Sequence, residues 1–90
     1  MVLKTELVET ERETVLRLVG RITSPEVERL QAQVASARTS VVLDLEQVDL
    51  VDLDATRFLA AAELRGIELR HVPRYIREWI HLEKPKVGNE

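Results

Sequence analysis

Residues 41–56 read VVLDLEQVDLVDLDAT, and this stretch decides the fold. The run Val41–Leu45 is short, continuous and apolar, and it begins with β-branched residues. Such a run is typical of a central strand that is covered on both faces of its sheet. An acid-rich stretch follows over Glu46–Asp54, and strong helix formers then run from Ala55 to Arg65. A buried strand followed by a helix predicts an α/β protein.

Two further strands and a helix precede this stretch. Apolar and polar residues alternate over residues 3–8 and again over residues 14–19, where Gly20 is expected to end the strand. The short polar connection between the two runs predicts an antiparallel hairpin. The sequence Thr23-Ser24-Pro25-Glu26 then predicts a helix start, with a hydroxyl as the cap and an acid in the first turn.

The C-terminal third predicts a strand and a last helix. Gly66 is a plausible left-handed helix cap, and alternation resumes from Ile67 to His71. Pro73 is expected to open a helix that buries one face, with Trp79 in the core or lying over it as a lid. The alternative is an exposed Trp79 that anchors an interface. The residues expected on that face are Val72, Ile76, Trp79 and Ile80. The element order predicts a mixed sheet of about four strands with three main helices packed on it.

Composition narrows the function classes. The chain has 90 residues with a net charge of −3, which fits one domain over residues 1–83 and a flexible tail over residues 84–90. It has no cysteine, so thiolate catalysis, thiolate metal sites and disulfides are excluded. The acidic balance gives no basic footprint for nucleic acid, and no stretch reaches the length of a membrane span. We therefore expect no nucleic-acid partner and no direct membrane insertion.

The densest group of candidate functional residues is acidic: Asp44, Asp49, Asp52 and Asp54. One interpretation is a magnesium site in a phospho-accepting or enzymatic domain, although no lysine lies between Lys4 and Lys84 to assist it. A second is structural, with Asp52 or Asp54 capping the helix that follows. A third is recognition, with the loop before this helix as the docking surface of a partner. The second and third are compatible.

Other chemistry finds little support. His71 and His81 have no second ligand at metal-binding spacing, and no Ser/His/Asp arrangement is recognisable. The glycines are isolated, so no phosphate-cradling loop is present. We expect no catalytic residue, no metal and no cofactor.

Helical spacing divides the helix after Asp52 into two faces. If one face packs on the sheet, with Ala55, Phe58, Leu59 and Ala62, the other is an outer stripe of Asp54, Arg57, Ala61 and Leu64. We expect a partner on this stripe, and an ordinary solvated helix face is the competing interpretation.

The element order and the segments Val41–Leu45 and Val48–Asp52 resemble the STAS family, which includes anti-sigma-factor antagonists and domains attached to anion transporters. In that family a v-v-L-D-L strand leads to a v-x-x-i-D-S-S-G-L pattern that opens a helix. The resemblance extends over residues 3–82, with Leu18–Ile22 similar to the family's segment before its first helix. Asp52 matches the family aspartate, whereas Leu53 and Asp54 replace the two serines. Asp54 therefore stands where the family usually has its phosphoacceptor.

The resemblance implies a non-catalytic, cytoplasmic regulatory module of bacterial type that binds a protein. Its partner would be an anti-sigma factor of the serine-kinase type, with Asp54 as a fixed charge that a serine kinase cannot modify. The alternative is a subunit that docks on a cytoplasmic component of a membrane transporter. A weak homodimer is compatible with either role. The expected partner-binding residues are Asp52, Leu53, Asp54, Ala55, Arg57, Ala61 and Leu64.

Overall fold

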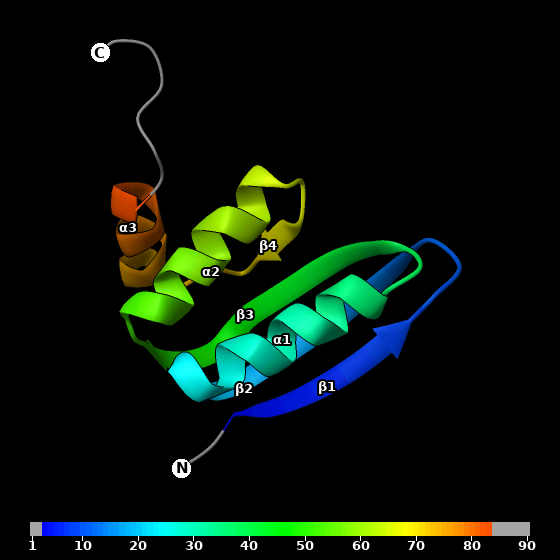
Figure 1. Ribbon diagram of the computed structural model, residues 1–90, viewed down its shortest axis with the longest axis horizontal. Helices are drawn as coiled ribbons and strands as arrows, with labels where there is room; N and C mark the ends of the chain where they lie inside the picture. The colour runs from blue at the N-terminus through cyan, green and yellow to red at the C-terminus, as the bar shows by residue number, and fades with distance from the viewer. Residues whose placement is uncertain (1–2, 84–90) are drawn as a thin grey trace, which may run out of the picture.

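The computed structural model describes residues 3–83, so the expected tail at residues 84–90 lies outside the described residues. Strands and helices alternate after an initial hairpin (Figure 1). The elements are β1 (Lys4–Glu9), β2 (Glu13–Ile22), α1 (Ser24–Ser36), β3 (Ser40–Val51), α2 (Leu53–Leu64), β4 (Glu68–Arg70) and α3 (Arg74–Glu83).

The strands form one four-stranded sheet in the order β1-β2-β3-β4. β1 pairs antiparallel with β2, as expected for a hairpin, whereas β2–β3 and β3–β4 are parallel. The parallel pairs are the ones connected through helices, because a parallel neighbour needs a crossover connection. The mixed sheet with three helices over residues 3–83 confirms the predicted fold class.

The core lies between the sheet and the helical layer. Figure 1 shows α1 and α2 lying over one face of the sheet, with α3 beside α2. Leu16 of β2 and Leu43 of β3 lose nearly all solvent contact here, and they belong to the same apolar cluster as Leu30 of α1 and Leu59 of α2. Burial of each such side chain contributes about 1.5–3 kcal/mol, so this layer supplies most of the stabilisation.

Two of the predicted strand ends are wrong, because β2 and β3 are longer than expected. β2 passes through Gly20, whose φ of 105° only glycine adopts easily, and continues to Ile22. β3 runs on through the acid-rich stretch to Val51, and the pairing with β2 shifts register between Arg17 and Val19 and again at Gly20. These bulges let the acidic segment stay paired while Val48 and Val51 turn inward.

The face of the sheet opposite the helices is charged. Glu6, Arg17, Asp44 and Arg70 are cross-strand neighbours in successive strands. The Arg17 guanidinium lies 3.8 Å from the Glu6 carboxylate, and Arg70 lies 3.1 Å from the carboxylate of Glu68. The Arg17–Glu6 pair joins neighbouring strands and stabilises the sheet, whereas Arg70 and Glu68 belong to the same strand β4. Asp44, in the middle of the row, is only 6% exposed.

The placement of Trp79 differs from expectation. Helix α3 buries Ile76 and Ile80 completely, whereas Trp79 remains 45% exposed. The two isoleucines are four residues apart and fill the inward stripe, which turns Trp79 away from the core. The prediction of Trp79 as a core residue is therefore wrong, and its exposure fits the alternative of an exposed tryptophan.

The fold makes a stability prediction for α3. Ile80→Ala should lower the free energy of unfolding by about 2–5 kcal/mol, because it opens a cavity under a fully buried side chain. Leu82→Ala, on the same helix but 77% exposed, should change it by less than about 0.5 kcal/mol. Urea unfolding followed by circular dichroism measures both, and equal effects would mean that α3 is not docked as described.

Candidate functional site

One carboxylate joins the N-termini of α1 and α2. Asp52 is the N-cap of α2, and its Oδ1 accepts a hydrogen bond from the backbone N–H of Ala55 at 2.8 Å. Its Oδ2 accepts the backbone N–H of Ser24, the first residue of α1, also at 2.8 Å. The expectation that Asp52 or Asp54 caps the helix is confirmed for Asp52. The link to α1 was not predicted, since it joins residues 28 apart in sequence.

Ser24 also connects the cap to Asp54. The Ser24 hydroxyl lies 2.7 Å from Oδ2 of Asp54 and 3.1 Å from Oδ2 of Asp52, so it can donate to either carboxylate. Asp54 is exposed in the first turn of α2, where the helix dipole favours a negative charge. Its side chain is thereby held at the surface, with one oxygen directed to α1.

The cap also fixes the ionisation of Asp52. Burial by itself raises the pKa of this carboxyl, but the hydrogen bonds from Ala55 and Ser24 outweigh burial and hold the pKa below its usual value. Asp52 is therefore charged at neutral pH, and its charge is used within the fold.

The faces of α2 are as the helical spacing predicted. Ala55, Phe58, Leu59 and Ala62 are buried, whereas Asp54, Arg57, Ala61 and Leu64 are exposed. The Arg57 guanidinium pairs with Glu83 of α3 at 3.2 Å, and Leu64 is 59% exposed. Two of the seven expected partner-binding residues are not free to contact a partner. Ala55 is buried, and the carboxylate of Asp52 accepts the backbone N–H groups of Ser24 and Ala55. The other five, Leu53, Asp54, Arg57, Ala61 and Leu64, form one exposed surface.

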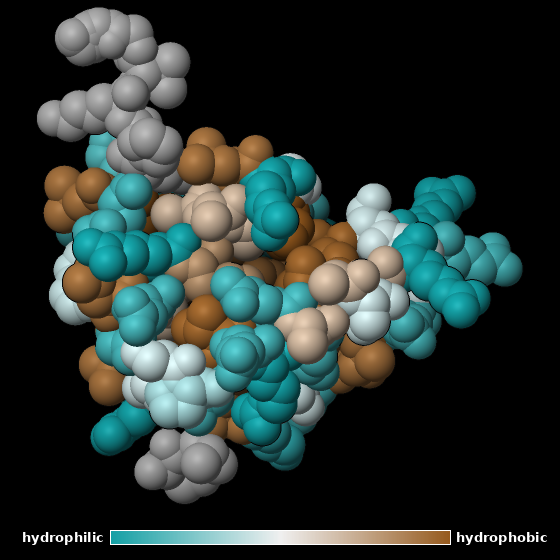
Figure 2. Space-filling model, viewed as in Figure 1, coloured by the Kyte–Doolittle hydropathy of each residue, from teal (hydrophilic) through white to brown (hydrophobic). Residues whose placement is uncertain are grey.

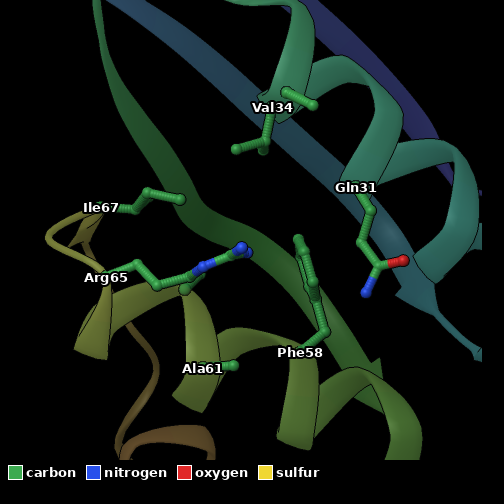
Figure 3. Close-up of a pocket in the computed structure, with 8 residues that line it drawn as sticks. Gln31, Val34, Phe58, Ala61, Arg65 and Ile67 are labelled. Atoms are coloured by element: carbon green, nitrogen blue, oxygen red, sulfur yellow. The ribbon is translucent and has the colours of Figure 1, made fainter.

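A groove with an apolar floor lies between α1 and α2. A hollow of ≈ 280 Å³ lies at its far end, where Val34, Phe58 and Ile67 line it and the side chains of Phe58 and Arg65 point inward (Figure 3). A second, more open hollow of ≈ 480 Å³ continues from Phe58 to Asp54. Hydrophobic atoms are visible in this hollowed region of the surface in Figure 2. The groove therefore begins at the acidic end near Asp54 and ends at the basic Arg65.

A second cluster lies at the end of β4, away from this groove. His71 Nδ1 lies 3.2 Å from Asp44 Oδ1, and Glu46 completes a group whose ligand atoms lie within 4.8 Å of one another. His71 also has a φ of 57°, which is uncommon for a residue with a side chain. The sequence analysis found no partner for His71, because Asp44 belongs to a different strand.

The surroundings of this cluster suit an internal ion pair. Burial raises the pKa of Asp44, but the Glu46 N–H, His71 and the charge of Arg17 outweigh it and hold the pKa below its usual value. Asp44 is therefore already compensated, and the positive charge of Arg17 opposes a bound cation. Among residues 3–83, no group of three metal-ligating side chains includes Asp49, Asp52 or Asp54.

No helix within residues 3–83 has the length and apolarity needed to cross a membrane.

The family model described as "Mlab, STAS domain" matches residues 5–83. No curated protein matches the chain in sequence.

Solved structures share the fold at low sequence identity. The anti-sigma factor antagonist SpoIIAA in its unphosphorylated form is 18% identical, with a TM-score of 0.68 over 99% of this chain and 90% of that one. An anti-sigma-factor antagonist STAS domain from Rhodobacter sphaeroides is 22% identical, with a TM-score of 0.57 over 93% of this chain and 92% of that one. A solved structure of Mglu is 22% identical, with a TM-score of 0.62 over 76% of this chain. This chain spans only 19% of the length of that one.

The capping geometry predicts unequal roles for the two aspartates. Asp52→Ala should lower the free energy of unfolding by about 1–2 kcal/mol, because α2 loses its N-cap and the Ser24 N–H of α1, whose own N-cap is Thr23, loses its acceptor. Asp54→Ala should cost less than about 1 kcal/mol, since Asp54 caps no backbone N–H and loses only its dipole interaction and an exposed hydrogen bond from the Ser24 hydroxyl, which Asp52 can still accept. Urea unfolding at about pH 7 measures both. Equal losses would contradict the assignment of Asp52 as the shared cap.

The cap at Asp52 also predicts that the stability of the fold depends on pH. Asp52 has a lowered pKa in the folded state, so its stabilisation is present above the unfolded-state pKa and is lost as the pH falls through the folded-state value. The stability difference between wild type and Asp52→Ala should therefore narrow as the pH drops below about 4. A difference that stays constant down to about pH 2 would show that the carboxylate charge is not what stabilises the caps.

Proposed function

The chain belongs to the STAS family, and we propose that it is a non-catalytic regulatory module that acts by binding another protein. The observation that carries this proposal is the exposed surface of α2. Asp54, Arg57, Ala61 and Leu64 are all solvent-accessible on a helix whose start is fixed by the Asp52 cap. A rigid helix with an exposed stripe beside an apolar groove offers a partner a preorganised contact.

Asp54 gives this surface a permanent negative charge. The family resemblance aligns Asp54 with the usual phosphoacceptor, and a serine kinase cannot modify an aspartate. A carboxylate carries a charge of −1, against about −1.5 to −2 for a phosphoserine. We infer that the module is locked in one charge state as an antagonist of an anti-sigma factor. The exposure of Asp54 and its support by Ser24 are consistent with this role.

The second candidate is a subunit that docks on a cytoplasmic component of a membrane transporter. Asp54 itself favours this alternative, because constitutive docking requires no hydroxyl that can be phosphorylated. The two candidates use the same surface and differ in how strongly binding depends on the charge at residue 54.

Affinity capture from a lysate of the source cell tests the choice between them. The wild-type chain, Asp54→Ser and the charge-loss control Glu11→Gln, in the exposed hairpin turn, serve as parallel baits read by mass spectrometry. The locked-antagonist role predicts capture of a kinase-type anti-sigma factor, with a clear difference between wild type and Asp54→Ser only. Transporter components recovered equally by all three baits would establish docking in its place. Recovery of neither class would contradict both candidates.

The proposal also predicts that Asp54 is not a phosphoacceptor in its own right. Asp54 belongs to no metal-ligating group of three within residues 3–83, and a phospho-accepting aspartate needs a bound magnesium ion beside it. Incubation with Mg²⁺ and acetyl phosphate should leave the intact mass unchanged. A mass gain that disappears in Asp54→Asn would place the chain among phospho-accepting domains instead.

A further inference from the structure

A patch of exposed apolar side chains covers the outer side of α3 and the start of α2. Trp79 is 45% exposed, Leu82 77% and Leu53 50%, and they line a shared hollow of ≈ 160 Å³. Tyr75, 39% exposed, extends it by an edge-to-face contact with Trp79 at a ring distance of 6.3 Å. We call these four residues the α3 patch. Figure 2 shows hydrophobic atoms at the surface on the side of the molecule where α3 lies.

The patch is a second apolar stripe on a helix that already has one. Ile76 and Ile80 fill the inward stripe and are fully buried, so packing against α2 does not require Trp79 or Leu82. A large aromatic and a leucine left side by side in water lose the stabilisation that burial would give. Tryptophan also contributes more than most residues when it is buried at a protein interface.

The charges around the patch indicate which partner fits. Within residues 3–83, three basic side chains near the patch are paired: Arg57 with Glu83 at 3.2 Å, Arg74 with Glu78 at 3.7 Å and Arg77 with Glu63 at 2.7 Å. Arg21 of β2, opposite Leu50, and His81 are the basic side chains left over in this part of the chain. Asp54, beside Leu53, and Asp49, whose carbonyl accepts the Tyr75 hydroxyl at 2.7 Å, have no ion pair within residues 3–83. With two acids against the single arginine, the unmatched charge bordering the patch within residues 3–83 is net negative.

This charge argues against two other occupants. A second copy joined patch to patch through a two-fold axis would add its own Asp49 and Asp54 to the border of the same interface, and this doubled negative charge opposes that contact. An anionic membrane surface would be repelled in the same way. A protein segment with basic residues beside its apolar side chains is attracted by both features.

We propose that the α3 patch binds an amphipathic partner segment whose apolar side chains are flanked by Lys or Arg. This inference rests on the proposed function and names the chemistry of the partner. Leu53 and the Arg57–Glu83 pair connect the patch to the exposed stripe of α2, so that one partner spans both.

Fluorescence titration with defined peptides tests this directly. Trp79 is the only tryptophan in the chain, so its emission reports on the patch. The probes are two synthetic amphipathic helices of about 18 residues, one with Leu and Lys and the other with Glu in every Lys position. The Leu/Lys peptide should shift Trp79 emission to the blue in a saturable manner, and the Leu/Glu peptide should not bind.

Matched variants distinguish binding at the α3 patch from nonspecific binding of the peptide elsewhere on the protein. Leu82→Ser should weaken binding of the Leu/Lys peptide about tenfold or more, the effect of losing one buried leucine contact. Leu7→Ser, at a 54% exposed leucine on the edge strand β1, should leave binding unchanged. Equal binding of both peptides, or equal effects of the two variants, would overturn the proposal.

Further arms test the other occupants and the proposed function. A dimer in sedimentation that Leu82→Ser disrupts would reassign the patch to a second copy. Tighter peptide binding after removal of residues 84–90, which include Lys84 and Lys86, would reassign it to the chain's own end. If a captured partner depends on Asp54 but not on Leu82, the proposed function stands and the patch fails. If binding of the Leu/Lys peptide needs Leu82 while no partner is captured, the α3 patch stands as a binding surface and the proposed function fails.

Discussion

The carboxylate of Asp52 is the constraint on which the functional surface depends. It accepts backbone N–H groups from the first turns of α1 and α2 at 2.8 Å each, so two helices that cross over different strand pairs start from one point. The backbone N–H of Asp52 also donates to Ile22 at 3.2 Å, which ties the cap to the end of β2. Because helix ends must satisfy their free N–H groups, this one residue ties the starts of α1 and α2 to each other at one end of the groove.

The two faces of the sheet are suited to different tasks. One face carries the helical layer and the apolar core, and the groove and the α3 patch lie at or beside this layer. The opposite face carries a row of alternating charges that includes Arg17 and Asp44, beside a row of valines that includes Val15. The exposed apolar side chains of α2 and α3 therefore lie on helices whose other faces pack on the core, which is what a binding surface on regular elements requires.

The sequence was most informative where local chemistry decides the structure. The apolar run Val41–Leu45, the capping sequence at Thr23 and the left-handed glycine at Gly66 all predicted what the structure has, because each depends on neighbouring residues. The two faces of α2 followed from helical spacing alone. The joint cap at Asp52 and the Asp44–His71 contact could not be predicted, since each joins residues more than 25 apart. The exposure of Trp79 was expected only as the alternative, because hydrophobicity does not tell which of two apolar stripes on α3 packs inward.

Hydrogen–deuterium exchange of the full chain, with and without its captured partner, tests the central claim most directly, namely that the helical layer around Asp54 is the binding surface. Binding there should slow amide exchange in α2 (Leu53–Leu64) and α3 (Arg74–Glu83), while the β1–β2 hairpin exchanges as before. Protection confined to β1 and to the charged face of the sheet, with α2 unchanged, would contradict the account.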